Sequence, residues 1–165
     1  MVSLCMKRDG RTLDHQTLET IRLMAIERVR EGERPSEVIE AYGPVPHIVC
    51  TPSQLNQIFL NLIVNASQAI EGGGRITVAT REDSGFVRID VTDTGTGIAP
   101  GILDRIFEPY FTTKQAMTQP GAGLGLATVY GIVEAHGGTI ELLDGDPKGT
   151  LVRVVESGFD KLPPE

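Results

Sequence analysis

The sequence predicts a two-layer α/β (α+β) sandwich, a mixed β-sheet with helices on one face. Residues 75–80 and 86–92 alternate apolar and polar side chains with a period of two, and the turn residues 83–85 between them predict a hairpin. Residues 53–70 carry apolar side chains at helical spacing, so one face of this helix is expected to be buried. A chain of 165 residues with 40% apolar content is long enough to bury one such core.

Three elements are predicted before the hairpin. An amphipathic helix is expected over residues 13–31, because its apolar residues follow one helical stripe. Two short strands at 37–41 and 47–51 follow, and they are expected to pair with each other. The helix at 53–70 then ends at the three glycines 72–74.

A long irregular stretch follows the hairpin, from residue 93 to 123, with one short helix near 102–107. A loop of that length inside a compact domain usually has a function. A further helix at 124–136 and strands at 139–143 and 150–155 complete the predicted sheet.

Composition narrows the functional class. A net charge of -7 without any run of Lys or Arg argues against a nucleic-acid partner, which needs clustered cations. Cys5 and Cys50 form neither a disulfide framework nor a metal-ligand spacing, as expected of a reduced cytoplasmic protein. The apolar runs are shorter than a bilayer span and no signal peptide is recognisable, so no membrane contact is expected from this segment.

Amide side chains occupy the polar face of the helix at 53–70, which contains no charged residue. Asn61 and Asn65 lie four residues apart, with Gln57 and Gln68 on the same row. Amide oxygens bind Mg²⁺ without adding negative charge beside a triphosphate. The row therefore indicates a phosphate and magnesium site, and an ordinary polar helix is the alternative.

Asp93 follows the strand at 86–92 on the same side as its apolar residues. A carboxylate aimed at the core needs a hydrogen-bond donor, and the exocyclic amine of adenine would supply one. Gly95 and Gly97 would let the backbone turn and approach the base closely. The alternative is a simple turn after a strand.

Gly121, Gly123 and Gly125 lead into the predicted helix at 124–136. Free N–H groups at a helix start form a natural phosphate seat. No strand directly precedes these glycines and no P-loop signature exists, so this is neither a Rossmann nor a P-loop site. Lys114 in the preceding loop would add a cation, although a flexible loop with a solvated lysine is the alternative.

Four motifs in this order resemble the ATP-binding domain shared by sensor histidine kinases, type II topoisomerases and MutL, the Bergerat fold. They are the N box at residues 61–66, the first glycine box at 93–98, the F box at 107–114 and the second glycine box at 121–126. The F box and the His-Gly-Gly at 136–138 are similar to those of histidine kinases. Within these, the sequence Phe-Glu-Pro-Tyr-Phe-Thr-Thr-Lys most resembles the nitrogen-regulation type.

The resemblance implies a role for each motif. Asn65 would ligate Mg²⁺, Asn61 and Gln68 would lie by the phosphates, and Asp93 would read adenine. Residues 98–123 would form the ATP lid, and Thr150 would support Asp93 through a water. The implied ATP-binding residues are Asn61, Asn65, Gln68, Asp93, Gly95, Gly97, Ile98, Thr112, Thr113, Lys114, Gly121, Ala122, Gly123, Leu124, Gly125, Leu126 and Thr150.

One position distinguishes the reaction types of this superfamily. Members that hydrolyse ATP have a glutamate where this chain has Asn61, and an amide cannot act as a general base. No residue of this chain is identified as catalytic; Asn61 only stands at the position of the general base. The resemblance therefore implies a protein histidine kinase that donates the γ-phosphoryl group of ATP to a histidine on a dimerisation domain in trans, with a response regulator downstream.

The acceptor histidine is expected outside this chain, because His15 lacks the adjacent acid and the later Pro of the acceptor pattern. Residues 1–34 are then the remnant of a linker to a dimerisation hairpin, 35–157 the catalytic domain, and 158–165 a tail. The protein would be cytoplasmic, or the cytoplasmic part of a membrane-bound sensor. The alternatives are a non-catalytic binding module of the same fold and a hydrolysing ATPase of the topoisomerase or MutL type.

Overall fold

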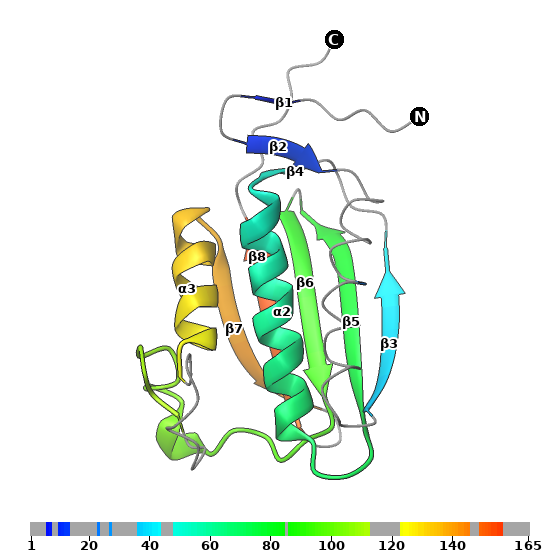
Figure 1. Cartoon of the computed structure of the whole chain (residues 1–165), viewed down its shortest axis with the longest axis vertical. Coiled ribbons are helices and arrows are strands. Elements are labelled where there is room, and N and C mark those ends of the chain that lie inside the picture. Colours follow the sequence, from blue (N-terminus) through cyan, green and yellow to red (C-terminus); the bar gives the residue numbers. More distant parts are fainter. Residues whose placement is uncertain are drawn as a thin grey trace.

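The structure is a computed structural model of the chain. It describes residues 6–7, 10–13, 23, 27, 36–43, 48–84, 86–112, 123–145 and 149–156. Helices α2 (Pro52–Ala69) and α3 (Gly125–Ala135) lie side by side on one face of a β-sheet (Figure 1). This arrangement confirms the predicted two-layer sandwich with a mixed sheet and helices on one face. In the described residues, no helix is both long and apolar enough to cross a membrane.

The main sheet has five strands in the order β3-β5-β6-β8-β7. Their bounds are β3 Ser36–Tyr42, β5 Gly74–Asp83, β6 Phe86–Asp93, β7 Thr139–Asp144 and β8 Thr150–Glu156. β3 runs parallel to β5 and the other neighbours are antiparallel. The predicted hairpin is confirmed, since β5 and β6 pair up to Asp83 opposite Phe86.

A second, small sheet contains β1 (Met6–Lys7), β2 (Gly10–Leu13) and β4 (Ile48–Cys50), in the order β1-β2-β4. The predicted pairing of the strands at 37–41 and 47–51 is therefore wrong, although both strands exist. β4 pairs with β2, whereas β3 pairs with β5 over seven residues. β4 is only three residues long, so β5 offers β3 the longer hydrogen-bonded ladder.

The predicted helix at 13–31 lies largely outside the described residues. Leu13 belongs to β2, so the helix does not include it. Leu23 and Glu27, the other described positions in this range, are helical and exposed. The predicted boundary between residues 34 and 35 also stays a prediction, and the β2–β4 pairing connects the two sides of it.

The core lies between α2, α3 and the sheet. The predicted apolar stripe of α2 is confirmed, since Leu55, Phe59 and Leu62 are at most 2% exposed. They pack with alternate residues of β5 and β6, such as Val78 and Ile89, and with one side of α3. Full burial of one such side chain stabilises the fold by about 1.5–3 kcal/mol.

Glycine ends α3 as predicted. Gly137 has a φ of 68°, and Gly138 N–H donates to the carbonyl of Val133 at 2.9 Å, which satisfies the last turn of the helix. The short helix expected near 102–107 is different in the structure. A 3₁₀ turn covers Pro100–Ile102, with Pro100 at its start, and irregular turns follow it in place of a helix.

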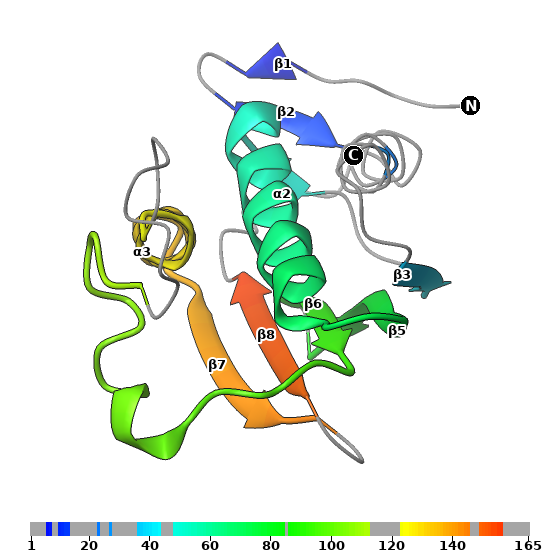
Figure 2. The same ribbon diagram turned by 60° about the horizontal axis from the view of Figure 1, so that its bottom comes forward.

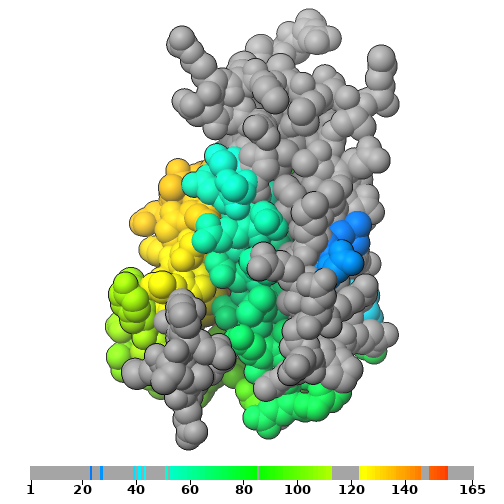
Figure 3. All heavy atoms as spheres, in the orientation of Figure 1, coloured from blue at the N-terminus to red at the C-terminus, as the bar shows by residue number. Residues whose placement is uncertain are grey.

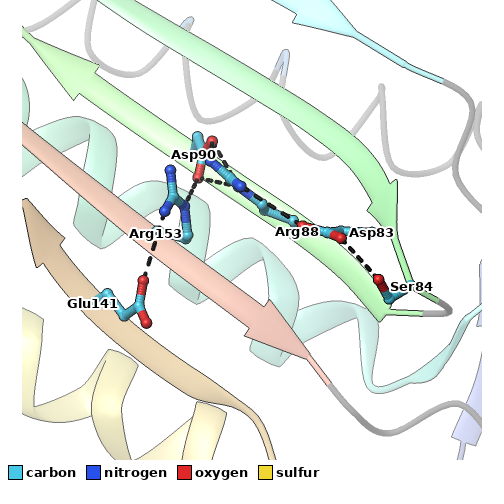
Figure 4. Close-up of polar contacts among 6 residues, drawn as sticks. All are labelled: Asp83, Ser84, Arg88, Asp90, Glu141 and Arg153. Carbon is cyan, nitrogen blue, oxygen red and sulfur yellow. Dashed lines mark hydrogen bonds and ion pairs between the residues drawn. The ribbon is translucent and has the colours of Figure 1, made fainter.

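The far face of the sheet, opposite α2 and α3, carries an ion cluster (Figure 4). Asp90 of β6 accepts hydrogen bonds from Arg88 on the same strand and from Arg153, which lies directly opposite on β8. Arg153 also approaches Glu141 of β7 at 3.7 Å. The cluster therefore links three adjacent strands.

The segments that carry the sequence motifs meet at one end of the molecule, the lower end in Figure 1. There β6 ends, β8 begins, α2 ends and α3 begins. Figure 2 brings this end forward and shows the chain after β6 running past β8 and β7 towards α3. In the space-filling view the C-terminal half of α2 faces outward beside the start of α3 (Figure 3).

Candidate functional site

Asp93 is buried at the end of β6, as the sequence predicts. The strand alternates so that Val87, Ile89, Val91 and Asp93 face the helices, and Asp93 is 5% exposed. Gly95 N–H donates to its Oδ1 at 2.7 Å, and the backbone N–H of Thr150 also donates to the carboxylate. Burial raises the pKa of Asp93, and these two bonds offset the rise only in part. The water-mediated support expected from Thr150 stays a prediction.

The turn after Asp93 is tied to two other elements. Thr94 N–H donates to the carbonyl of Arg75 at 3.1 Å, and Arg75 N–H donates to Thr94 Oγ1 at 2.9 Å. Thr96 N–H donates to the carbonyl of Ala69, in the last turn of α2, at 3.1 Å. The carboxylate therefore projects from a turn that is anchored on both the sheet and α2.

Two glycines are required for this packing. A Cβ on Gly95 would collide with the carbonyl of Ala69 and lie 2.8 Å from Asp93 Oδ1. Gly149, with a φ of 109°, lies against Asp93, and a Cβ there would collide with the carbonyl of Asp93. Gly97 has a φ of 76°, which favours glycine. The structure thus adds a reason for Gly95 that the sequence did not predict, namely its contact with α2.

The amides of α2 meet the start of α3. A Cβ on Gly125, the first residue of α3, would lie 3.4 Å from Asn65 Nδ2 and 3.6 Å from Asn61 Oδ1. Both asparagines are half-buried, whereas Gln57 and Gln68 are exposed. Two motifs that are 60 residues apart in the sequence therefore lie together, with the N–H groups of a helix start beside two neutral amides.

The second glycine box and the F box are in contact. Tyr110 N–H donates to the carbonyl of Gly123 at 2.9 Å, and both residues have positive φ, 67° and 77°. A Cβ on Gly123 would lie 2.6 Å from the carbonyl carbon of Tyr110. This contact joins the middle of the predicted lid, residues 98–123, to its last residue. Thr113, Lys114, Gly121 and Ala122 lie outside the described residues, and their roles stay predictions.

The first half of the predicted lid packs on α3. Phe107 lies against Tyr130 of α3, with 5.3 Å between the ring centres. Arg105 lies 4.5 Å from the centre of the Phe111 ring and pairs with Glu108. The remaining predicted site residues of this region, Ile98, Thr112, Leu124 and Leu126, are all half-buried.

The described side chains near this site would bind a hard divalent cation only together with a phosphate ligand. The described residues contain no group of three or more His, Cys, Asp or Glu side chains that could hold a metal. A cation at this site would therefore depend on the amide oxygens of α2 and on oxygens that a bound phosphate brings with it, a combination that suits Mg²⁺.

Sequence reasoning missed three contributors: the Thr94 hydroxyl, the Ala69 carbonyl and the backbone of Gly149. Thr94 and Gly149 stand inside or beside recognised motifs, and the signal for them was their position next to Asp93 and Thr150. A backbone carbonyl such as that of Ala69 leaves no signal in a sequence.

Comparison with known proteins identifies the family of this chain. Residues 50–157 match the family described as histidine kinase-, DNA gyrase B-, and HSP90-like ATPase. Sensor histidine kinase ZraS of Escherichia coli K12 is 50% identical over 110 residues, which are 67% of this chain and 23% of ZraS. Sensor kinase CckA of Brucella abortus is 40% identical over 61% of this chain and 12% of CckA. The chain thus spans about a quarter or less of these relatives.

Solved structures give the same assignment. A mycobacterial sensor histidine kinase, MprB, has a TM-score of 0.71 and 30% identity, covering 84% of this chain and 93% of that chain. Full-length ShkA in complex with AMPPNP has a TM-score of 0.74 and 29% identity, covering 92% of this chain and 31% of that chain. The nitrogen-regulation subtype stays a prediction. The chain belongs to the histidine kinase-, DNA gyrase B- and HSP90-like ATPase family, as the catalytic-type domain found in sensor histidine kinases.

Proposed function

We propose that this chain binds ATP with Mg²⁺ and donates the γ-phosphoryl group to a histidine on a dimerisation domain in trans, within two-component signalling. The observation that carries the proposal is the buried carboxylate of Asp93, on a turn bonded to the end of α2, together with the contact of Asn61 and Asn65 of α2 with the start of α3. The site thus offers a polar acceptor for a base and, beside it, a place for phosphates. Full-length ShkA, a relative by fold and sequence, is described in complex with AMPPNP, an ATP analogue.

The proposed role of Asp93 is to recognise adenine. Its carboxylate receives only backbone N–H donors in the described residues, and no cation contributes to its pKa. A desolvated carboxylate has a strong preference for a further N–H donor, such as the exocyclic amine of adenine. A base with a carbonyl at that position would place two acceptors together and would be rejected.

The proposed role of α2 and α3 is to hold the phosphates. N–H groups at the start of α3 favour an anion, and Asn65 would ligate Mg²⁺ through its amide oxygen. Bound Mg²⁺ supplies charge neutralisation for phosphoryl transfer. Asn61 stands beside this position but has no basic group to activate a water, so hydrolysis is expected to be slow and the phosphoryl group is kept for a histidine acceptor.

The test is calorimetric titration of ATP, and separately of AMPPNP, with and without Mg²⁺. We expect magnesium-dependent binding that Asp93→Asn reduces at least tenfold, because the new amide N–H₂ faces the base amine. Asp90→Asn is the matched control, since Asp90 lies three residues earlier on the far face of the same strand. No binding by the parent protein would reject the proposal in favour of a non-catalytic binding module.

A second measurement separates transfer from hydrolysis. Labelled ATP is incubated with the chain and with the dimerisation hairpin of a related sensor kinase, and we expect label on the hairpin histidine. Steady hydrolysis that Asn65→Ala abolishes would favour the rival ATPase of the topoisomerase or MutL type. A histidine that is never labelled despite ATP binding would favour the binding module. A downstream response regulator and a cytoplasmic location belong to the same proposal.

A further inference from the structure

Thr94, Gly95 and Thr96, which form the turn after β6, each make a hydrogen bond to another part of the chain. One of these bonds involves a side chain that has no assigned role. Asp93 and Gly95 contact each other through the carboxylate, and Thr96 is held by the backbone of Ala69. Thr94 is held by its own hydroxyl, which accepts the N–H of Arg75 at 2.9 Å. Thr94 is therefore the position, besides Asp93 itself, where the turn depends on a side-chain group.

The Thr94 hydroxyl replaces a backbone carbonyl. In a regular antiparallel ladder, two residues that form a hydrogen-bonded pair exchange both N–H···O=C bonds. Thr94 N–H does donate to the Arg75 carbonyl, at 3.1 Å, but the return bond from Arg75 N–H goes to Oγ1. The carbonyl of Thr94 is thus released from this pair, and the chain turns away from β5 at the residue that follows Asp93.

The hydroxyl has a defined place in the packing. A Cβ on Gly74, at the start of β5, would lie 2.9 Å from Thr94 Oγ1. Thr94 is nevertheless exposed, so the loss of its hydroxyl would leave no buried cavity. Its neighbour Gly95 donates to Asp93 Oδ1 at 2.7 Å, so a shift of the turn would change the direction of the carboxylate.

We infer that the Thr94 hydroxyl is a positioning group that fixes the direction of the Asp93 carboxylate and thereby contributes to the discrimination of adenine from bases with a carbonyl at the same ring position. The inference rests on the proposed function and deepens it. Thr94 touches no base in this scheme; it acts through Asp93, and its effect is on selectivity.

The test compares the dissociation constants of ATP and inosine triphosphate for Thr94→Val and Thr94→Ser. We expect Thr94→Val to weaken ATP binding about fivefold, the effect of one lost hydrogen bond, and to leave inosine triphosphate binding unchanged. Thr94→Ser keeps a hydroxyl and should restore the ratio. Thr139→Val, at the exposed first residue of β7, is the matched control for the substitution itself. Amide exchange at Arg75 should accelerate in the valine variant alone.

The outcomes separate the two ideas. Wild-type protein that binds no ATP contradicts the proposed function. Wild-type protein that binds ATP, together with a Thr94→Val variant of unchanged ATP to inosine triphosphate ratio, overturns only the positioning role. Equal losses for both nucleotides, or a serine variant that behaves like valine, would also overturn it, because a general structural defect or a lost methyl contact would then explain the result.

Discussion

Asp93 combines a structural cost with a proposed chemical use. Its carboxylate is 5% exposed, and burial raises its pKa above the ordinary value of 3.8 despite two backbone donors. The folded protein therefore binds a proton more tightly at this position than the unfolded chain does. The free energy that ionised Asp93 costs the empty fold would be recovered when a ligand donor reaches the carboxylate.

The first prediction concerns the stability of the nucleotide-free protein. Because the pKa of Asp93 is raised by folding, its favourable contribution is complete below about pH 3.8 and is lost as the pH rises through the folded pKa. Asp93→Asn has no such loss, and its Oδ1 can still accept Gly95 N–H. We therefore expect the stability of Asp93→Asn relative to the wild type, measured as the difference in the free energy of unfolding, to increase as the pH rises from 3.8.

Urea unfolding at a series of pH values, without nucleotide, measures this difference. A variant that instead loses stability relative to the wild type with rising pH would show that the carboxylate is stabilising when ionised, contrary to the burial of Asp93.

Gly149 gives the second prediction at this scale. Its φ of 109° and the overlap of any Cβ with the Asp93 carbonyl mean that Gly149→Ala must distort the backbone on which Asp93 depends. We expect a loss of at least ~2 kcal/mol in the free energy of unfolding. Gly131→Ala is the control, because no atom outside the adjacent backbone of α3 lies within 4 Å of its Cβ position, and it should stabilise by about 0.5–1 kcal/mol. Thermal unfolding of both variants gives the comparison, and similar effects would contradict the prediction.

At the scale of secondary-structure elements, the sequence pattern correctly predicted features that depend on residues close together in the chain. The stripe of α2, the hairpin of β5 and β6 and the glycine end of α3 each depend on residues close in sequence, and each is confirmed. The predicted partner of β3 was wrong, because the choice between β4 and β5 depends on how many residues each distant strand can pair with β3. At the site, the meeting of Asn65 with Gly125 followed from the motifs, whereas the contact of Ala69 with Gly95 could be read only from packing.

The ion cluster on the far face supplies the third prediction. Burial pushes the pKa of Asp90 up, but hydrogen bonds from Arg88 and Arg153 outweigh it, and the pKa lies below 3.8. Its stabilising contribution is therefore present above pH 3.8 and is lost as the pH falls through the folded pKa. We expect Asp90→Asn to lower the free energy of unfolding by about 1–2 kcal/mol at neutral pH, less than a fully buried pair because water reaches the cluster.

Glu141→Gln is the matched control for this cluster. Glu141 is 56% exposed and 3.7 Å from Arg153, so its loss should change stability by less than ~0.5 kcal/mol. Urea unfolding at neutral and acidic pH compares the two variants, and the effect of Asp90→Asn should shrink as the medium is acidified. A constant effect at all pH values would mean that the charge of Asp90 is not the cause.

At the scale of the whole molecule, the two faces of the sheet carry different types of side chain. The face towards α2 and α3 contains the apolar core and, at one end, the candidate site, whereas the far face carries the ion cluster. The relatives place this domain in proteins at least four times as long as the matched segment. In this chain β6, which ends at the candidate site, lies between β5 and β8 near the centre of the sheet.

The contact between Thr150 and Asp93 also sets when the candidate site can first be complete. The two residues are 57 positions apart, and the second begins the last strand of the sheet. During synthesis at about 5–20 residues per second, Asp93 leaves the ribosome several seconds before Thr150 can reach it. Throughout that interval the carboxylate lacks one of its two backbone donors, so the proposed acceptor for the base is incomplete. The proposed ATP site would therefore be complete only after Thr150 has joined the sheet.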